Sequence, residues 1–242
     1  MLGIKDGKIE KKELDMAREK VKVDMFNWGP CVVRMKISEE FRKLLISEAK
    51  KNKLDMRGKL AGQIDKETAY SEESKAKILP YMANCLGIYD QAWQSYTRKK
   101  LDKAPEYVLS ALWINYQRPN EFNPPHDHDG KLSFVIYCEI PEKLKEENKK
   151  YIGRSCGPGG IQFLYGEGTR DAITYMSHFP EQGEMFIFPA WLKHWVSPYR
   201  SDCTRISVSG NIHDSAPLNN IQRFGPEYVK DREERDSKKT DS

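Results

Sequence analysis

Residues 113–141 read WINYQRPNEFNPPHDHDGKLSFVIYCEIP. Two stretches rich in aromatic and β-branched residues stand on either side of a polar segment that contains prolines and an Asp-Gly dipeptide. The outer stretches are typical of β-strands and the inner segment is typical of a turn. At its centre, His126 to Asp129 are two histidines and two aspartates in alternation. The stretch therefore predicts two strands with a candidate metal-binding segment between them.

Side-chain direction decides which of these four residues can share an ion. In an extended segment, residues i and i+2 face the same side, so His126 and His128 can converge while Asp127 points away. Asp129 precedes Gly130 in a turn dipeptide, and a bend there can redirect its carboxylate. The geometry favours His126 and His128 as ligands and leaves Asp129 as an alternative.

A third ligand has to come from elsewhere in the chain. His194 lies in GEMFIFPAWLKHWVSP, where a strand ends at Pro189 and a short loop leads into the next strand. Arg205 follows eleven residues later, at the start of RISVSGNI. On that strand Arg205 and Ser207 share one face, and a buried arginine is costly unless it meets an anion. We therefore expect an anion to bind at Arg205.

Working outward, the chain divides into three parts. Residues 1–105 hold two expected helices, one capped by Ser38 and one spanning Ser71 to Arg98, and they form an extension that supports the rest. Residues 106–213 hold several short strands at the spacing of a sandwich or barrel. Residues 214–242 form a C-terminal extension whose charged end, Lys230 to Asp241, is expected to be disordered. The fold class is α+β.

Two further features concern order and environment. Glu142 to Lys150 holds seven charges in nine residues, and we expect a solvated loop or a flap beside the site. The net charge of +4 over 242 residues is small, so nucleic acid is not indicated as a partner. The sequence contains no apolar run of about 20 residues and no secretory signal, and its five cysteines form no CxxC pair. These features favour a cytoplasmic protein with reduced thiols and no membrane partner.

The segments quoted above resemble the iron(II)- and 2-oxoglutarate-dependent oxygenases. More narrowly, they resemble a group of these enzymes from phages and bacteria that has a His-x-His element. The likeness covers about residues 106–213, and LAGQI at Leu60–Ile64 resembles the same group without an assignable role. The resemblance implies a double-stranded β-helix, a cupin-like jelly roll, with the N-terminal helices packed on one sheet.

The resemblance also implies the chemistry. Iron(II), 2-oxoglutarate and O2 are the expected cofactor and co-substrates, and the expected reaction is hydroxylation of an unactivated C–H bond with release of succinate and CO2. No catalytic residues are expected beyond the metal ligands. Arg205 is expected to bind the C5 carboxylate of 2-oxoglutarate, and further contacts are expected from Ser207, Asn115, Tyr137 and Asn211.

One departure from the family leaves alternatives open. Position 128 is His where most of the superfamily has Asp or Glu, so the shell is an all-histidine face, includes Asp129, or has a water or halide in place of the carboxylate. Strand alternation ranks the all-histidine face of His126, His128 and His194 first. A three-histidine dioxygenase without 2-oxoglutarate and a non-catalytic jelly-roll binding module are the alternative functions. The substrate is unknown, with a protein side chain or a small metabolite favoured, and the oligomeric state is open.

Overall fold

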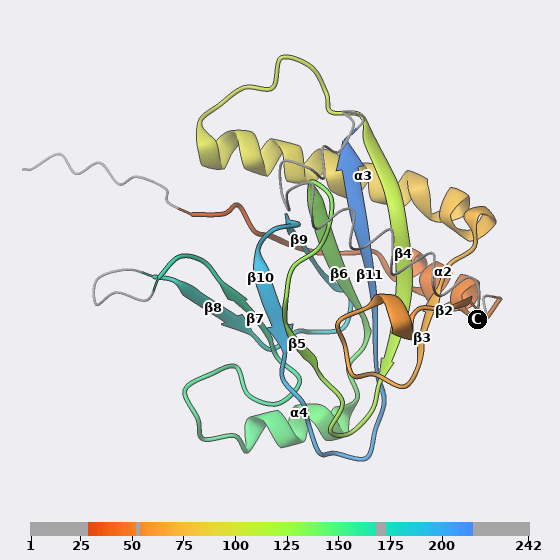
Figure 1. Cartoon of the computed structure of the whole chain (residues 1–242), viewed down its shortest axis with the longest axis vertical. Helices are drawn as coiled ribbons and strands as arrows, with labels where there is room; N and C mark the ends of the chain where they lie inside the picture. Colours follow the sequence, from red (N-terminus) through yellow and green to blue (C-terminus); the bar gives the residue numbers. More distant parts are fainter. Residues whose placement is uncertain (1–28, 52–53, 168–172, 215–242) are drawn as a thin grey trace, which may run out of the picture.

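The computed structural model describes residues 29–51, 54–167 and 173–214, which form two antiparallel sheets with helices around them (Figure 1). The larger sheet has the strand order β1-β9-β6-β11-β4-β3-β2. Its strands are β1 (Val33–Lys36), β2 (Leu54–Asp55), β3 (Glu67–Ala69), β4 (Tyr107–Gln117), β6 (Leu132–Glu139), β9 (Glu184–Pro189) and β11 (Arg205–Asp214).

The smaller sheet has the order β5-β10-β7-β8. Its strands are β5 (Asn123–His126), β7 (Ile161–Leu164), β8 (Tyr175–His178) and β10 (Lys193–Val196). From β4 to β11 the chain alternates between the two sheets, apart from the β7–β8 hairpin of the smaller sheet, and this is the connectivity of a jelly roll. The expected double-stranded β-helix within an α+β architecture is confirmed.

Side-chain alternation along β6 shows how the layers are held together. Phe134 and Ile136 point to the face that is covered by helices α2 (Glu39–Ala49) and α3 (Glu72–Thr97). Val135 and Tyr137 point the other way and pack with side chains of the smaller sheet. The larger sheet is therefore buried on both faces. Helices cover one face, and a second packed cluster fills part of the space between the two sheets.

Ser38, the expected cap, precedes α2, and Ser71, the expected start of the second helix, caps α3. The Ser38 hydroxyl accepts a hydrogen bond from the Phe41 amide at 3.1 Å, and the Ser71 hydroxyl accepts one from the Ser74 amide at 3.2 Å. A side-chain hydroxyl at this position satisfies one of the amides that the first turn leaves unpaired.

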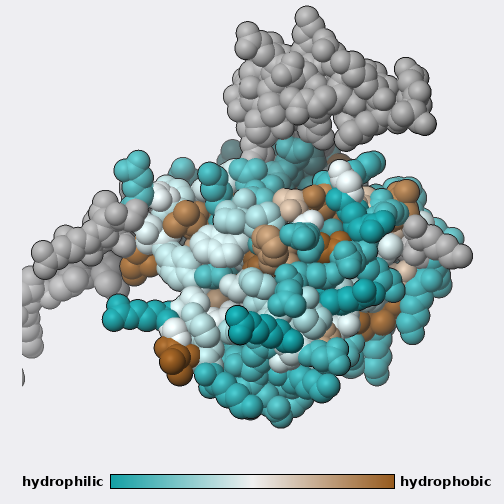
Figure 2. All heavy atoms as spheres, turned by 60° about the horizontal axis from the view of Figure 1, so that its bottom comes forward, coloured by the Kyte–Doolittle hydropathy of each residue, from teal (hydrophilic) through white to brown (hydrophobic). Residues whose placement is uncertain are grey.

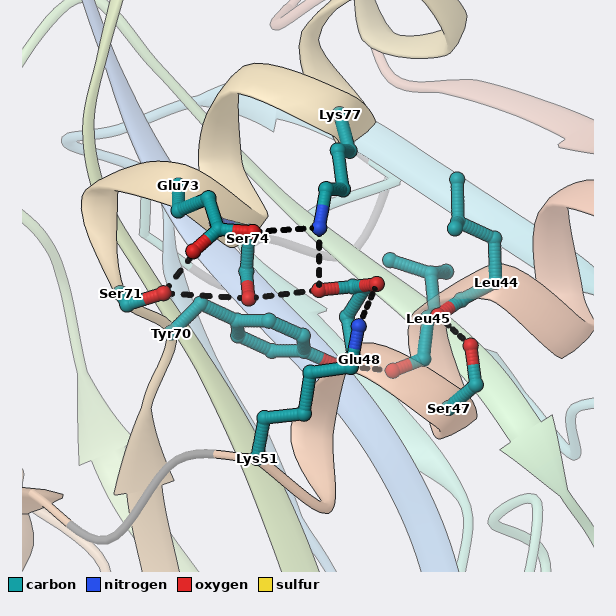
Figure 3. Close-up of polar contacts among 10 residues, drawn as sticks. All are labelled: Leu44, Leu45, Ser47, Glu48, Lys51, Tyr70, Ser71, Glu73, Ser74 and Lys77. Carbon is teal, nitrogen blue, oxygen red and sulfur yellow. Dashed lines mark hydrogen bonds and ion pairs between the residues drawn. The ribbon is translucent and has the colours of Figure 1, made fainter.

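A polar network joins α2 to α3 (Figure 3). Glu48 of α2 is 4% exposed, and its carboxylate accepts hydrogen bonds from Lys51 at 2.5 Å and from the Ser74 hydroxyl of α3 at 2.9 Å. Lys77 lies 3.7 Å from the same carboxylate. Because a buried carboxylate needs such partners, this network holds the two helices in one register against the sheet.

The expectation of a solvated loop or flap after β6 was wrong. Residues Glu142–Lys149 form helix α4, at the opposite end of the molecule from α3 in Figure 1. Leu144 is fully buried, and the Asn148 side chain donates hydrogen bonds to the carbonyls of Cys156 and Pro158 at 2.6 and 3.1 Å. The charged residues are carried on the exposed side of α4, and the molecular face brought forward in Figure 2 is largely hydrophilic.

The N-terminal part is integrated with the β-domain, because β1, β2 and β3 are strands of the larger sheet. The C-terminal segment expected to be disordered, 230–241, lies outside the described residues. In the part of the chain that the structure describes, no helix combines the length and apolarity needed to cross a bilayer.

Candidate metal and co-substrate site

A pocket lies between the two sheets and contains most of the expected site residues. It encloses about 510 Å³ of space free of atoms, part of it open to solvent. The smaller sheet and the segment after β5 contribute the histidines, and the larger sheet contributes polar side chains. The lining residues used below are Leu60, Ala61, Glu67, Trp113, Asn115, Asn123, His126, His128, His194, Arg205 and Ser207.

Three histidines converge on one side of this pocket. His126 and His194 are paired across β5 and β10, and one ring nitrogen from each of His126, His128 and His194 lies within 4.8 Å of the others. The Nε2 atoms of His128 and His194 are 3.2 Å apart. Two nitrogen ligands at about 2.1 Å from an ion and at right angles to each other are separated by about 3.0 Å. The spacing therefore suits adjacent ligands of one metal ion.

Backbone carbonyls orient two of these rings. His126 Nδ1 lies 2.6 Å from the Pro124 carbonyl oxygen, and His194 Nδ1 lies 2.9 Å from the Leu192 carbonyl oxygen. Because a carbonyl only accepts, each Nδ1 carries the proton and donates it. Each Nε2 then has a free lone pair, which is the arrangement that metal-binding histidines commonly have.

The surroundings of these rings favour the neutral form that binds metals. Burial lowers the pKa of His126, and burial together with the neighbouring His126 lowers the pKa of His194 to about 3. His194 is 5% exposed and packs against the rings of Phe163 and Phe188, with centroid distances of 6.0 and 4.7 Å. The His194 imidazole is therefore held in place before any ion binds.

Among the described residues, the group that could hold an ion contains no carboxylate. Neither Asp127 nor Asp129 belongs to this group, although they lie one and three residues after His126 in the sequence. The arrangement is consistent with the all-histidine face that strand alternation ranks first, and the choice between His128 and Asp129 as third ligand stays a prediction.

Arg205 also lines the pocket. Its side chain is 1% exposed, and one terminal nitrogen donates to the Gly159 carbonyl at 2.8 Å. Its Nε has no hydrogen-bond partner, and Arg205 has no acidic partner among the described residues. Burial lowers the pKa of this guanidinium. An anion bound here would supply the missing partner.

Tyr137 and Ser207 lie near Arg205, as expected. The Tyr137 ring centroid is 5.3 Å from the guanidinium carbon of Arg205, and its buried hydroxyl has no hydrogen-bond partner. Ser207 is 3% exposed and lines the pocket. A free hydroxyl donor beside a guanidinium fits a carboxylate ligand, so these side chains suit the C5 carboxylate of 2-oxoglutarate.

Asn115 and Asn211 are placed differently. Asn115 lines the pocket, but its amide nitrogen faces the hydroxyls of Ser207 and Ser209, each at 3.4 Å, and its Oδ1 has no partner. Asn211 is not among the residues that line the pocket, and its side-chain oxygen accepts from the Ser133 hydroxyl at 3.4 Å. The structure thus brings Asn115 to the site, whereas neither Asn211 nor Tyr137 is among the residues that line the pocket.

Sequence reasoning assigned no role to one wall of the pocket. Leu60 and Ala61 line it, and Gln63 pairs with Phe122 through a hydrogen bond from Gln63 N to the Phe122 carbonyl at 2.9 Å. Glu67 of β3 lines the same wall. The only signal for this wall was LAGQI, which covers Leu60–Ile64 but stops short of Glu67.

Solved structures similar to this chain include a prolyl hydroxylase and a protein solved with 2-oxoglutarate. A Pseudomonas putida prolyl-4-hydroxylase is 13% identical, with 74% of this chain and 90% of that chain covered and a TM-score of 0.46. HygX from Streptomyces hygroscopicus, solved with nickel, 2-oxoglutarate and hygromycin B, is 10% identical, with coverages of 86% and 88% and a TM-score of 0.47. No curated protein matches the sequence.

The family comparison is more direct. Residues 111–211 match the model of a family described as "Putative 2OG-Fe(II) oxygenase". The matched range contains His126, His128, His194 and Arg205. The family so named uses iron(II), 2-oxoglutarate and O2, and the pocket has donors for a metal ion and for a carboxylate. The resemblance seen in the sequence is thereby confirmed: across residues 111–211 this chain matches the iron(II)- and 2-oxoglutarate-dependent oxygenases.

Proposed function

We propose that this protein hydroxylates an unactivated C–H bond, with iron(II) held by His126, His128 and His194. The observation that carries the proposal is the combination of two groups in one pocket: three converging imidazoles and a buried arginine that lacks an acidic partner. When bound, iron(II) and 2-oxoglutarate supply the reduction of O2 coupled to oxidative decarboxylation. The overall reaction balances as RH + 2-oxoglutarate + O2 → ROH + succinate + CO2.

The residues of the chain have separate tasks in this reaction. Arg205 binds the C5 carboxylate of 2-oxoglutarate, and Tyr137 and Ser207 add hydrogen bonds to the same group. Asn115 positions the Ser207 hydroxyl through its amide nitrogen. The three imidazoles are neutral, so the metal retains its full positive charge, which strengthens the binding of an anionic co-substrate.

The buried arginine distinguishes this proposal from the alternatives. A three-histidine dioxygenase that does not use 2-oxoglutarate has no need for a buried guanidinium with an unpaired Nε in the metal pocket. A non-catalytic binding module has no need for three imidazoles that converge in one pocket. The proposal accounts for both features.

The test has two stages. Iron(II) and then 2-oxoglutarate are added without oxygen, and a weak visible charge-transfer band is expected when 2-oxoglutarate chelates the metal. A screen of peptides and metabolites, read by succinate release, then identifies the substrate. With 18O2, hydroxylation places one labelled atom in succinate and one in the product. A product without the label would contradict hydroxylation, and absence of the band with iron bound would contradict the use of 2-oxoglutarate.

A further inference from the structure

Glu67 is a buried carboxyl group without a cation to neutralise it. It is 2% exposed, and its Oε2 has no hydrogen-bond partner. Among the described residues, no lysine or arginine lies within ion-pair distance of it. The neighbouring Lys66 lies over the Tyr116 ring, 4.3 Å from its centroid. An unpaired buried carboxyl is strongly unfavourable unless a ligand completes it.

The carboxyl group faces the same pocket as the metal ligands. Glu67 is paired with Asn115 across β3 and β4, so the two side chains share one face of the larger sheet. Both line the pocket together with the three histidines. Trp113, two residues before Asn115 on β4, lies on the same face, and its ring is 5.7 Å from that of His128. Glu67 is therefore beside the metal site rather than in the outer surface.

Two of the unpaired buried atoms that line the pocket are side-chain oxygens. Glu67 Oε2 and Asn115 Oδ1 both lack donors, whereas Arg205 Nε is an unpaired donor. The Gln117 amide oxygen and the Tyr137 hydroxyl are unpaired as well, but neither residue lines the pocket. The anionic co-substrate suits Arg205, so the Glu67 and Asn115 oxygens are left for a different molecule.

The charge of Glu67 indicates which kind of molecule can bind beside it. Burial, with the negative charges of Glu121 and Asp55, raises the pKa of Glu67 to about 7. A second anion would meet repulsion here. A bound cation would stabilise the ionised carboxylate, and the face of the Trp113 indole is also favourable to a cation.

We propose that Glu67, with Asn115, selects the substrate, and that this substrate presents a primary ammonium or guanidinium group beside the C–H bond to be oxidised. The inference rests on the proposed function for the identity of the pocket. It assigns the substrate to a chemical class: molecules with a cationic nitrogen, such as amines or basic amino-acid side chains. Leu60 and Ala61 provide the apolar wall for the carbon chain of such a molecule.

Direct binding tests this assignment without turnover. Protein loaded with iron(II) and 2-oxoglutarate under anaerobic conditions is titrated calorimetrically with n-pentylammonium, n-butylguanidinium, 1-pentanol and hexanoate. The wild type is expected to bind the two cations about 10- to 100-fold more tightly than the alcohol, as charge-assisted hydrogen bonds imply. Glu67→Gln should abolish this preference while leaving iron(II) and 2-oxoglutarate affinities unchanged. Glu106→Gln, which changes an exposed glutamate, should retain it.

The outcomes separate this inference from the proposed function. Equal binding of cation and alcohol by the wild type, or a preference that survives in Glu67→Gln, would overturn the assignment. Loss of iron(II) from Glu67→Gln would make Glu67 a metal ligand and would overturn it as well. Failure of the wild type to convert 2-oxoglutarate to succinate would refute the proposed function instead, and the calorimetric preference would still be measured.

Discussion

The guanidinium carbon of Arg205 lies 5.3 Å from the centroid of the Tyr137 ring, and both side chains carry a buried polar atom without a partner. Arg205 Nε and the Tyr137 hydroxyl come from adjacent strands, β11 and β6. Buried donors without a partner are costly in the free protein. A carboxylate bound at Arg205 would give such donors a partner, which makes this part of the pocket selective for an anion.

Arg205→Ala is expected to weaken 2-oxoglutarate binding by roughly 2–5 kcal/mol, because it removes the buried positive charge. Tyr137→Phe removes one hydroxyl donor and should cost about 1 kcal/mol. Calorimetry with the iron(II) protein gives both values. Iron(II) affinity should persist in both variants, and Arg34→Ala, on an exposed side chain of β1, serves as the control. Unchanged 2-oxoglutarate affinity in Arg205→Ala would show that the assignment is wrong.

If His126, His128 and His194 hold the iron, substitutions of the histidines and of the neighbouring Asp127 should differ in their effect on iron binding. His126→Ala and His194→Ala should each abolish iron(II) binding and turnover, since each removes a ligand that is already oriented by a backbone carbonyl. Asp127→Asn should leave iron binding nearly intact. Iron titration measures each variant, with His178→Ala as a control on a histidine paired with Glu184.

The comparison of His128→Ala with Asp129→Ala decides the third ligand. His128 Nε2 is 3.2 Å from His194 Nε2, so His128→Ala is expected to empty the site and Asp129→Ala to spare it. The reverse result would mean a shell of two histidines and one carboxylate.

Glu67 predicts a stability that depends on pH. Its pKa is about 7 in the folded protein and 4.5 for an unperturbed glutamate. Below pH 4.5 both folded and unfolded states are protonated here, and no penalty exists. Between the two values the unfolded chain releases the proton while the folded protein keeps it, so stability falls as pH rises. Above pH 7 the full penalty of about 3 kcal/mol applies.

Glu67→Gln should therefore stabilise the metal-free protein at pH 8 much more than at pH 5. Urea unfolding of the wild type and the variant at the two pH values gives the difference directly. If the difference in unfolding free energy between the wild type and the variant is the same at pH 5 and pH 8, Glu67 ionises normally. A stability gain that accompanies loss of substrate binding is common for residues kept for function.

Gly62 and Gly58 offer a matched pair in the segment between β2 and β3. A Cβ at Gly62 would collide with the Asn123 side chain and would lie 3.4 Å from Glu67 Oε1, whereas a Cβ at Gly58 would meet nothing within 4 Å. Gly62→Ala is expected to lower the free energy of unfolding by roughly 1–3 kcal/mol. Gly58→Ala should change it by less than about 0.5 kcal/mol. Thermal and urea unfolding measure both, and equal effects would contradict the close approach at Gly62.

Much of the site could be predicted because strand alternation is a local rule. Arg205 and Ser207 share a buried face of β11, and Trp113 and Asn115 share a buried face of β4, as two-residue periodicity requires. His194 was identifiable from the strand and turn residues around it. The face to which a side chain points in such a strand follows from its place in the local sequence, so contacts with distant residues did not have to be known.

Other features depend on contacts that are distant in the sequence. Residues 67–69 read Glu-Thr-Ala, and they form a strand because they pair with residues 113–115 of β4, far along the chain. Their composition carries no strand signal. Helix α4 was misjudged for a related reason: its charges suggested a solvated loop, and burial of the single side chain Leu144 decided the outcome.

The order of the larger sheet bears on the solubility of the protein. Its longest strands, β4 with 11 residues and β11 with 10, lie in the interior, while its edges are β1 with four residues and β2 with two. Exposed edges of long strands act as templates for pairing with other molecules and so promote aggregation. In this sheet both edge strands are short. Strands contributed by residues 33–69 thus shield the interior strands from intermolecular pairing, and removal of that segment is expected to promote aggregation as well as loss of the Glu67 wall.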